Sequence, residues 1–183
     1  MNTSQVQSIL GAASRASKPA PVDEWDPPVC GEIDIRIAAD GTWYHEGRPF
    51  ARKRIPELFA RLLRKDADGL TYLVTPSERL SIQVDDAPLI VTAHEKTGAP
   101  TNPTLLLRTN MADVFEVGEK HPLRFENEGL TGGLKPYVRV RGRIEALINR
   151  ATAHAIFNDD DLVRAQGDAL LLTSGSYSVA IRP

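Results

Sequence analysis

The sequence predicts an α+β protein made of two similar units, each a small antiparallel sheet with one main helix. Short runs in which apolar and polar residues alternate recur along the chain, separated by turns that contain Gly or Pro. Two stretches, 55–63 and 144–155, instead carry apolar residues at the spacing of one helix face. A hairpin pattern follows each of these stretches, so the order of the elements repeats.

The chain begins with a segment of different composition. Residues 1–28 are rich in Ser, Ala, Gln and Pro, with prolines at 19, 21, 27 and 28. Too few apolar side chains are present to offset the entropy lost on ordering this segment. We expect a flexible N-terminal arm, with the binding of a partner protein as its alternative role.

The first α+β unit is expected over residues 29–97. Ile33, Ile35 and Ile37 alternate with charged residues, which is the pattern of a half-buried strand. Asp40-Gly41 is typical of a tight hairpin turn because both central positions need positive φ. The helix over 55–63 comes next, and the other strands of this unit are expected at 43–45, 72–74, 80–84 and 89–91.

Pro100 and Pro103 predict a linker over residues 98–103, because two nearby prolines stop either kind of element. The second α+β unit is expected over 104–183. Its strands are predicted at 105–109, 114–117, 123–125, 137–141, 170–173 and 177–181. The strand at 137–141 leads through Gly142 directly into the helix over 144–155.

The two units can be matched element by element. Trp43–Arg48 precedes the first helix as Tyr137–Arg143 precedes the second, and the hairpin at 72–84 resembles the hairpin at 170–181. We interpret this order as an internal duplication. Ligand pockets often form in clefts between such units, so we expect a binding site where the two units meet.

Composition excludes several classes of protein. A net charge of −2 argues against non-specific coating of nucleic acid. The single cysteine, Cys30, excludes a disulfide framework and a zinc site with several cysteines. No apolar run approaches the roughly 20 residues that cross a bilayer, and the N-terminus lacks the pattern of a signal peptide. We expect no membrane insertion and a cytoplasmic location.

The motifs that resemble catalytic or metal-binding signatures are incomplete. Gly129–Lys135 resembles a phosphate-binding loop, but Pro136 follows the lysine where Ser or Thr would bind magnesium. Asp159–Asp161 lacks the spaced ligands of a calcium loop, and the four histidines are scattered. We therefore nominate no catalytic residue, metal or cofactor.

The strand at 137–141 is the strongest candidate for a binding surface. Tyr137, Arg139 and Arg141 share one face of it, and planar guanidinium groups bind phosphate or carboxylate in bidentate fashion. The tyrosine ring could stack a base. Arg108, Asn110, Trp43 and Arg48 complete the predicted site. The alternative interpretation is an exposed strand edge that charge protects from aggregation.

Several motifs, taken together, resemble an uncharacterised bacterial family, domain-of-unknown-function family 1285. The resemblance covers about residues 30–183, and its motifs are Cys30–Arg36, Asp40–Tyr44, Tyr72–Pro76, Ile82–Pro88, Leu107–Asn110, His121–Arg124, Pro136–Arg141 and Glu145–Ile148. It implies a duplicated α+β core whose C-terminal half is similar to a pleckstrin-homology fold. It also implies a site at the domain interface that suits a nucleic-acid-based ligand, in a signalling context, and it implies no catalytic residue.

The leading hypothesis is a non-enzymatic binding module for an anionic, nucleotide-like ligand. The alternative is a protein–protein interaction scaffold that uses a pleckstrin-homology-like sheet edge or the N-terminal arm. An enzyme of unknown type is the least favoured class.

Overall fold

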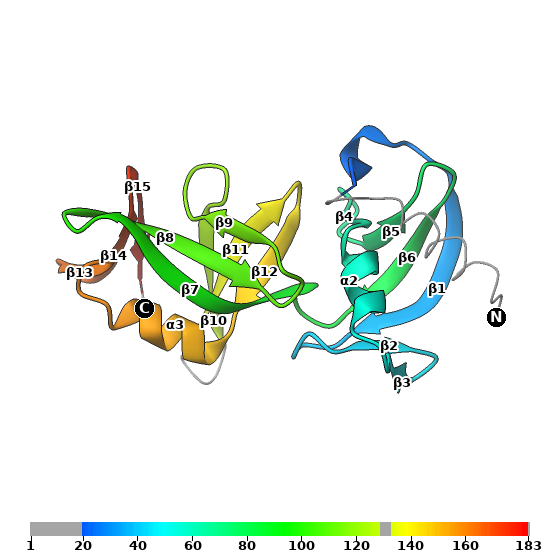
Figure 1. Ribbon diagram of the computed structural model, residues 1–183, viewed down its shortest axis with the longest axis horizontal. Helices are drawn as coiled ribbons and strands as arrows, with labels where there is room; N and C mark the ends of the chain where they lie inside the picture. The colour runs from blue at the N-terminus through cyan, green and yellow to red at the C-terminus, as the bar shows by residue number, and fades with distance from the viewer. Residues whose placement is uncertain (1–19, 129–132, 183) are drawn as a thin grey trace. The chain divides into compact units, whose positions relative to one another are not determined.

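The computed structural model describes residues 20–128 and 133–182 (Figure 1). The first compact unit comprises the described residues up to Pro88 together with Gly142–Ile144, and the second comprises those of Leu89–Arg141 and from Glu145 onward. This division differs from the predicted linker at 98–103, because that segment joins two paired strands, β7 (Leu89–Ala99) and β8 (Asn102–Thr109). Gly98 pairs with Pro103 and has a φ of 85°, so the glycine and prolines that predicted a linker form the end of a hairpin.

The first unit is a six-stranded sheet with the order β3-β2-β1-β6-β5-β4. Its strands are β1 (Val29–Ile37), β2 (Trp43–His45), β3 (Arg48–Pro49), β4 (Leu63–Lys65), β5 (Thr71–Val74) and β6 (Arg79–Val84). β1 and β6 are parallel, whereas the other neighbours are antiparallel. Helix α2 (Arg54–Ala60) lies between the third and fourth strands of the chain and buries Phe59.

The second unit repeats this topology. Its strands are β7, β8, β9 (Val114–Glu116), β10 (Leu123–Glu128), β11 (Gly133–Arg141) and β12 (Ile144–Ile148), in the order β10-β11-β12-β7-β8-β9. Here too the first and last strands, β7 and β12, pair in parallel. Each unit thus consists of two three-stranded meanders joined by its first and sixth strands, which confirms two similar units.

The correspondence between the two units differs from the predicted one. Trp43 begins the second strand of its unit, whereas Tyr137 lies in the fifth strand of the other. The two helices do not correspond either, because α2 lies between the third and fourth strands of its unit in the chain, whereas helix α3 (Arg150–Phe157) follows the sixth strand of the other. The prediction matched two helix–hairpin sequences that are unrelated in the topology.

The predicted helix over 144–155 is part strand and part helix. Ile144, Ala146 and Ile148 are buried with half-buried residues between them, which is the period of β12. Asn149 then caps α3, because its side-chain Oδ1 accepts a hydrogen bond from the Thr152 backbone N–H at 2.8 Å. The apolar residues of 144–148 fit the period of a strand as well as that of a helix. The cap at Asn149 is the feature that marks where the helix starts.

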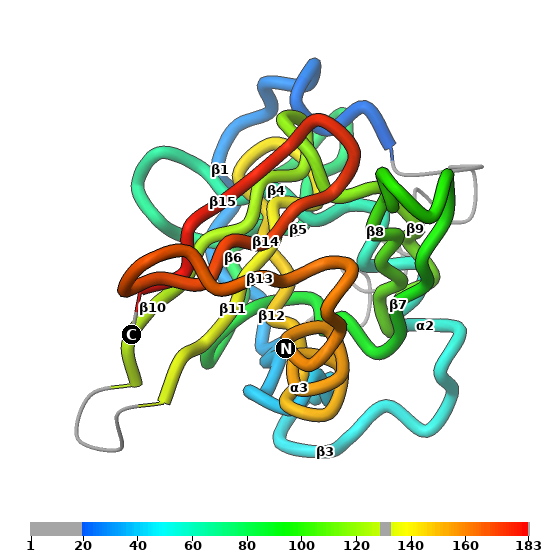
Figure 2. Tube along the Cα trace, turned by 90° about the vertical axis from the view of Figure 1, so that its left-hand side faces the viewer, coloured from blue at the N-terminus to red at the C-terminus, as the bar shows by residue number. Residues whose placement is uncertain are grey.

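A C-terminal extension follows α3. Strands β13 (Val163–Gln166), β14 (Ala169–Ser174) and β15 (Tyr177–Ile181) form a separate three-stranded sheet, which includes the predicted hairpin at 170–181. Figure 2 shows this sheet beside α3, in front of the strands of the second unit. The turn between β14 and β15 is attached to β8, since the Gly175 N–H donates to the Pro103 carbonyl at 2.9 Å.

Part of the predicted flexible arm is ordered. Residues 1–19 lie outside the described residues, but Val22–Glu24 form a 3₁₀ turn and Val22 is buried. The Arg64 guanidinium donates to the carbonyls of Val22 and Trp25 at 2.8 and 2.6 Å. It also pairs with Asp66, so an ion pair on β4 and the residue after it holds this segment. In the described part of the chain, no helix has the length and apolar character needed to span a membrane.

Candidate functional site

The structure places the predicted site residues in two different units. Trp43 and Arg48 belong to the first unit, and the other predicted residues belong to the second. Trp43 is a core residue, since it is 3% exposed and its ring centroid lies 6.4 Å from that of Phe59. Arg48 is exposed on the short edge strand β3. Only the arginine of this pair is accessible to a ligand.

Tyr137 is also inaccessible as a stacking platform. Its residue is 5% exposed, and the Arg124 guanidinium lies over its ring, 4.5 Å from the centroid. Arg124 in turn forms two hydrogen bonds with Glu145, at 3.0 and 2.8 Å, and a further ion pair with Glu126. The hydrogen bonds to Glu145 raise the pKa of Arg124 above its usual range. The Tyr137 ring is thus covered by Arg124, and the charge of Arg124 is neutralised by Glu126 and Glu145.

Arg141 and Asn110 hold the turn between β8 and β9. The Arg141 guanidinium pairs with Asp113 at 3.1 Å, and both side chains are 18% exposed. Asn110 and Ile90 exchange two hydrogen bonds, in which the Asn110 side chain accepts at 3.0 Å and its backbone N–H donates at 2.8 Å. These contacts give both residues a structural role.

Arg108 and Arg139 remain exposed, on β8 and β11 respectively. Within residues 20–128 and 133–182, neither side chain makes an ion pair. The two strands are separated in the sheet by β12 and β7. A site that combines these residues with those of the first unit stays a prediction.

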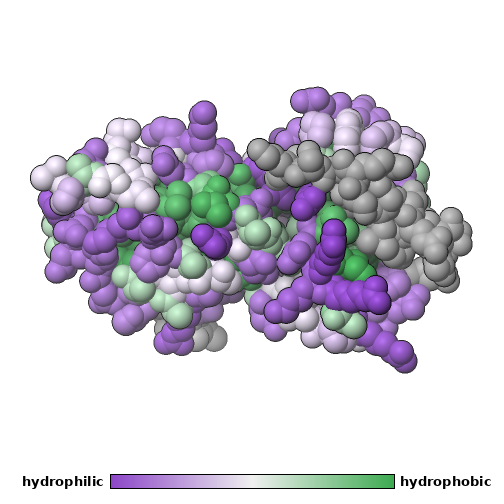
Figure 3. Space-filling model, viewed as in Figure 1, coloured by the Kyte–Doolittle hydropathy of each residue, from purple (hydrophilic) through white to green (hydrophobic). Residues whose placement is uncertain are grey.

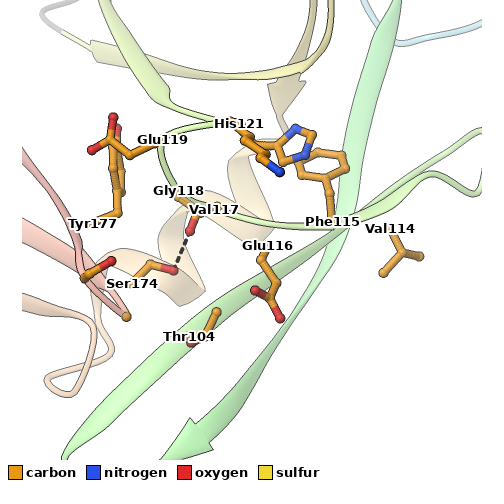
Figure 4. A pocket seen from close by; sticks show the side chains of 13 residues that line it. Thr104, Val114, Phe115, Glu116, Val117, Gly118, Glu119, His121, Ser174 and Tyr177 are labelled. Atoms are coloured by element: carbon orange, nitrogen blue, oxygen red, sulfur yellow. Dashed lines mark hydrogen bonds between the residues drawn. The ribbon is translucent and has the colours of Figure 1, made fainter.

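A pocket of about 680 Å³ lies elsewhere in the second unit, beside β9 (Figure 4). β9, the connection from β9 to β10 and the β14–β15 turn form its walls. The side chains that line it include Phe115, Glu116, Glu119, His121 and Tyr177. Sequence reasoning missed these residues because three segments far apart in the chain contribute them, and no local motif connects those segments.

Hydrogen bonds fix the walls of this pocket. The buried Ser174 hydroxyl accepts from the Leu105 N–H at 3.0 Å and donates to the Val117 carbonyl at 2.8 Å. The Tyr177 hydroxyl accepts from the Leu123 N–H at 3.0 Å. These bonds join the extension to β8, to the residue after β9 and to β10, and so hold the walls of the pocket together.

His121 is held in one orientation. Its Nδ1 lies 3.0 Å from the Arg139 carbonyl oxygen, which can only accept, so Nδ1 carries the proton of this bond. Its ring packs against Phe115 with centroids 4.7 Å apart. In the neutral form, Nε2 is therefore the acceptor. The described residues contain no group of three potential ligands that could hold a metal ion.

β9 is the last strand of its sheet, and one of its edges has no partner strand. The Asp113 carbonyl accepts from Thr109 and the Val117 N–H donates to Leu105, both at 2.9 Å, and Phe115 lies opposite Leu107. Since antiparallel bonding alternates along a strand, the N–H and C=O groups of Val114 and Glu116 point away from β8. No described residue bonds to these groups. Figure 3 shows an apolar area over β8 and β9, where Val114 is 50% exposed.

Fold and site together define a duplicated, mainly β protein with a pocket and an open strand edge in its second unit. The model for the N-terminal domain of DUF1285, a domain of unknown function, matches residues 20–87, and the model for the C-terminal domain of the same family matches residues 88–176. The chain belongs to the DUF1285 family, and the border between the two models agrees with the division into units.

Two solved structures are similar to the chain. A DUF1285 family protein from Silicibacter pomeroyi is 35% identical, with a TM-score of 0.85, over 95% of this chain and 94% of that one. A DUF1285 family protein from Shewanella baltica is 23% identical, with a TM-score of 0.55, over 68% of this chain and 90% of that one, and supports the fold alone. No curated protein matches the chain.

Proposed function

We propose that the protein is a non-enzymatic interaction module whose second unit, similar to a pleckstrin-homology sheet, binds an extended segment of a partner protein along β9. The observation that carries this proposal is the open backbone edge at Val114 and Glu116, next to a pocket. An extended peptide added to such an edge gains affinity from main-chain hydrogen bonds and specificity from adjacent pockets.

The surroundings of β9 support this proposal. Native proteins usually protect an edge strand with charge, proline or a covering element. β9 has no proline, and Val114 presents a half-exposed apolar side chain. The edge is also held rigidly, because Arg141 and Thr109 both bind Asp113 at its start. A rigid edge costs less entropy on binding than one that must first be ordered.

An anionic, nucleotide-like ligand is the second candidate, in a signalling context. It is supported by the exposed Arg139 and by Lys120 and His121 on the connection from β9 to β10. The mixed charge of the pocket favours it less, because Glu116 and Glu119 line the same cavity.

Both candidates can be tested on the full-length protein. Heptapeptides selected by phage display are titrated against ¹⁵N-labelled protein, and a nucleotide and cyclic-dinucleotide panel is titrated in parallel. We expect peptides to shift the amide signals of β9, and Val114→Pro to abolish the effect because it removes one N–H from the open edge. Val114→Thr, which keeps that N–H, should bind as the wild type does.

Two results would overturn the proposal. One is nucleotide binding that Arg139→Ala removes while no peptide binds. The other is peptide binding that N-methylation of the peptide at every second residue leaves unchanged, because strand pairing requires alternate N–H groups. The N-methylated peptides keep the test decisive if Val114→Pro does not fold.

A further inference from the structure

Two carboxylates lie beside the open edge of β9. Glu116 is on β9 itself and Glu119 follows three residues later, and both are exposed. Within the described residues neither makes an ion pair or a hydrogen bond through its side chain. Figure 4 shows Glu119 beside the Tyr177 ring, whereas His121 stacks on Phe115 at the other end of the pocket. Glu116 lies apart from both pairs, on β9.

The register of β9 determines which side chains a bound strand would meet. Side chains alternate between the two faces of a strand, so Val114 and Glu116 share one face and the buried Phe115 lies on the other. Residues directly opposite each other on neighbouring strands place their side chains on the same face. A strand added to β9 would therefore place two side chains, separated by one residue, next to Val114 and Glu116.

We propose that the segment bound along β9 carries a lysine or arginine opposite Glu116 and an apolar residue opposite Val114, with one residue between them. This inference rests on the proposed function and specifies its partner by charge and by spacing. Glu119, beside the Tyr177 ring, adds a second negative charge to the lining of the same pocket, which favours a cationic partner. The apolar residue would cover the exposed surface of Val114.

The basic residues nearby do not neutralise Glu116 or Glu119. Arg108 lies opposite Val114 in the register, not opposite Glu116, and no ion pair joins it to either carboxylate in the described chain. Lys120 follows Glu119 but makes no ion pair with it. Glu116 and Glu119 are therefore available to a partner of opposite charge.

The sequences of the selected heptapeptides provide the first test. Enriched peptides should carry Lys or Arg two positions from an apolar residue, in one order or the other according to strand direction. Glu116→Gln with Glu119→Gln should weaken the binding of a synthesised winner about tenfold, which is the upper range for two solvent-exposed charge pairs. Replacing the peptide's basic residue by Glu should weaken wild-type binding to a similar extent.

A charge exchange separates this inference from the proposed function. Glu116→Lys should prefer the Glu-substituted peptide over the original, while Glu126→Lys, a change on β10 at the other end of the strand order, should leave the preference unchanged. Peptides that bind along β9 without a charge preference would overturn the basic-residue inference and leave the proposed function standing. If no peptide binds, or if β9 pairs only with a second copy of this chain, both proposals fail.

Discussion

The two units share one strand order but differ in the connection between their two meanders. In the first unit, residues 50–62 contain α2, whose Phe59 is fully buried and lies 5.9 Å from Phe50. In the second unit, residues 117–122 contain only the bridge between Gly118 and His121. Residues 117–121 of this second connection line the pocket. The same topology therefore carries a helix in one unit and a cavity in the other.

The corresponding edge strands differ in a consistent way. β3, the third strand of the first unit, has two residues, and Pro49 removes one backbone donor. β9, the third strand of the second unit, has three residues without proline. Since short length and proline are usual protections of an edge, β3 is better protected than β9. The two units thus share a topology but differ in how much of the edge of their third strand is open to pairing.

The comparison is tested most strongly by removing the aromatic anchor of α2. Phe59→Ala should lower the free energy of unfolding of the first unit by about 3–5 kcal/mol, because it leaves a large cavity beneath the helix. Phe115→Ala in the second unit should cost less, since that side chain borders the pocket. Native-state hydrogen exchange measures each unit separately, and equal losses would contradict the assignment of α2 as the core plug of its unit.

The second unit should depend instead on its C-terminal extension. Ser174→Ala leaves the buried Leu105 N–H and the Val117 carbonyl without their partner, so we expect a loss of about 2–3 kcal/mol. Ser176→Ala, at an exposed position in the same turn, serves as the matched control and should change stability little. Urea unfolding gives both values. A negligible loss for Ser174→Ala would show that the extension does not support the pocket wall.

A smaller effect is expected at the start of α3, the helix that follows the second sheet. Asn149→Ala should cost about 1 kcal/mol because it removes the side-chain acceptor for the Thr152 N–H. Asn149→Asp retains an acceptor at the helix N-terminus and should be close to neutral. The same urea titration distinguishes the two variants, and equal losses for both would argue against the cap.

The smallest effect concerns the ion pairs between β7 and the end of α3. The Lys96 ammonium holds the pKa of Asp159 below its ordinary value of 3.8. Because the folded pKa is depressed, this stabilisation is fully present above pH 3.8 and is lost as the pH falls through the folded pKa. The thermal midpoint of Asp159→Asn should therefore fall less between pH 6 and 3 than that of the wild type. Asp160→Asn should follow the wild-type profile.

Much of the sheet could be predicted from the sequence, because alternation along a strand is a local property. The Ile33–Ile37 strand and the C-terminal hairpin form as expected. Asp40-Gly41 lies in the connection between β1 and β2, but only Gly41 has a positive φ, of 83°, so the turn is not the tight two-residue turn that was predicted. The sequence predicts a helix over residues 144–148 because a short segment with apolar residues at 144, 146, 147 and 148 fits the period of a helix as well as that of a strand. The parallel pairing of the first and sixth strands has no local signal at all, so the true repeat was not detected.

The candidate site was less predictable than the fold. Tyr137 and Arg141 carry side chains that bind ligands in many proteins, but Arg124 and Asp113 engage them here. Those partners lie 13 and 28 positions away in the sequence, and only the sheet register brings them together. An open edge is likewise a property of strand order, because it depends on which strand has no neighbour.

In each unit the first and sixth strands pair in parallel at the centre of the sheet, and this pairing has a consequence for biosynthesis. Each three-stranded meander forms from segments that are neighbours in the chain. The two meanders of the first sheet can pair only after β6 has been synthesised, because β1 pairs with β6. Non-local pairing of this kind slows folding because loop-closure entropy is lost before the contacts form. On the ribosome, we expect the first meander to stay unclosed until Val84 has left the exit tunnel, so that each unit is completed by its own last strand.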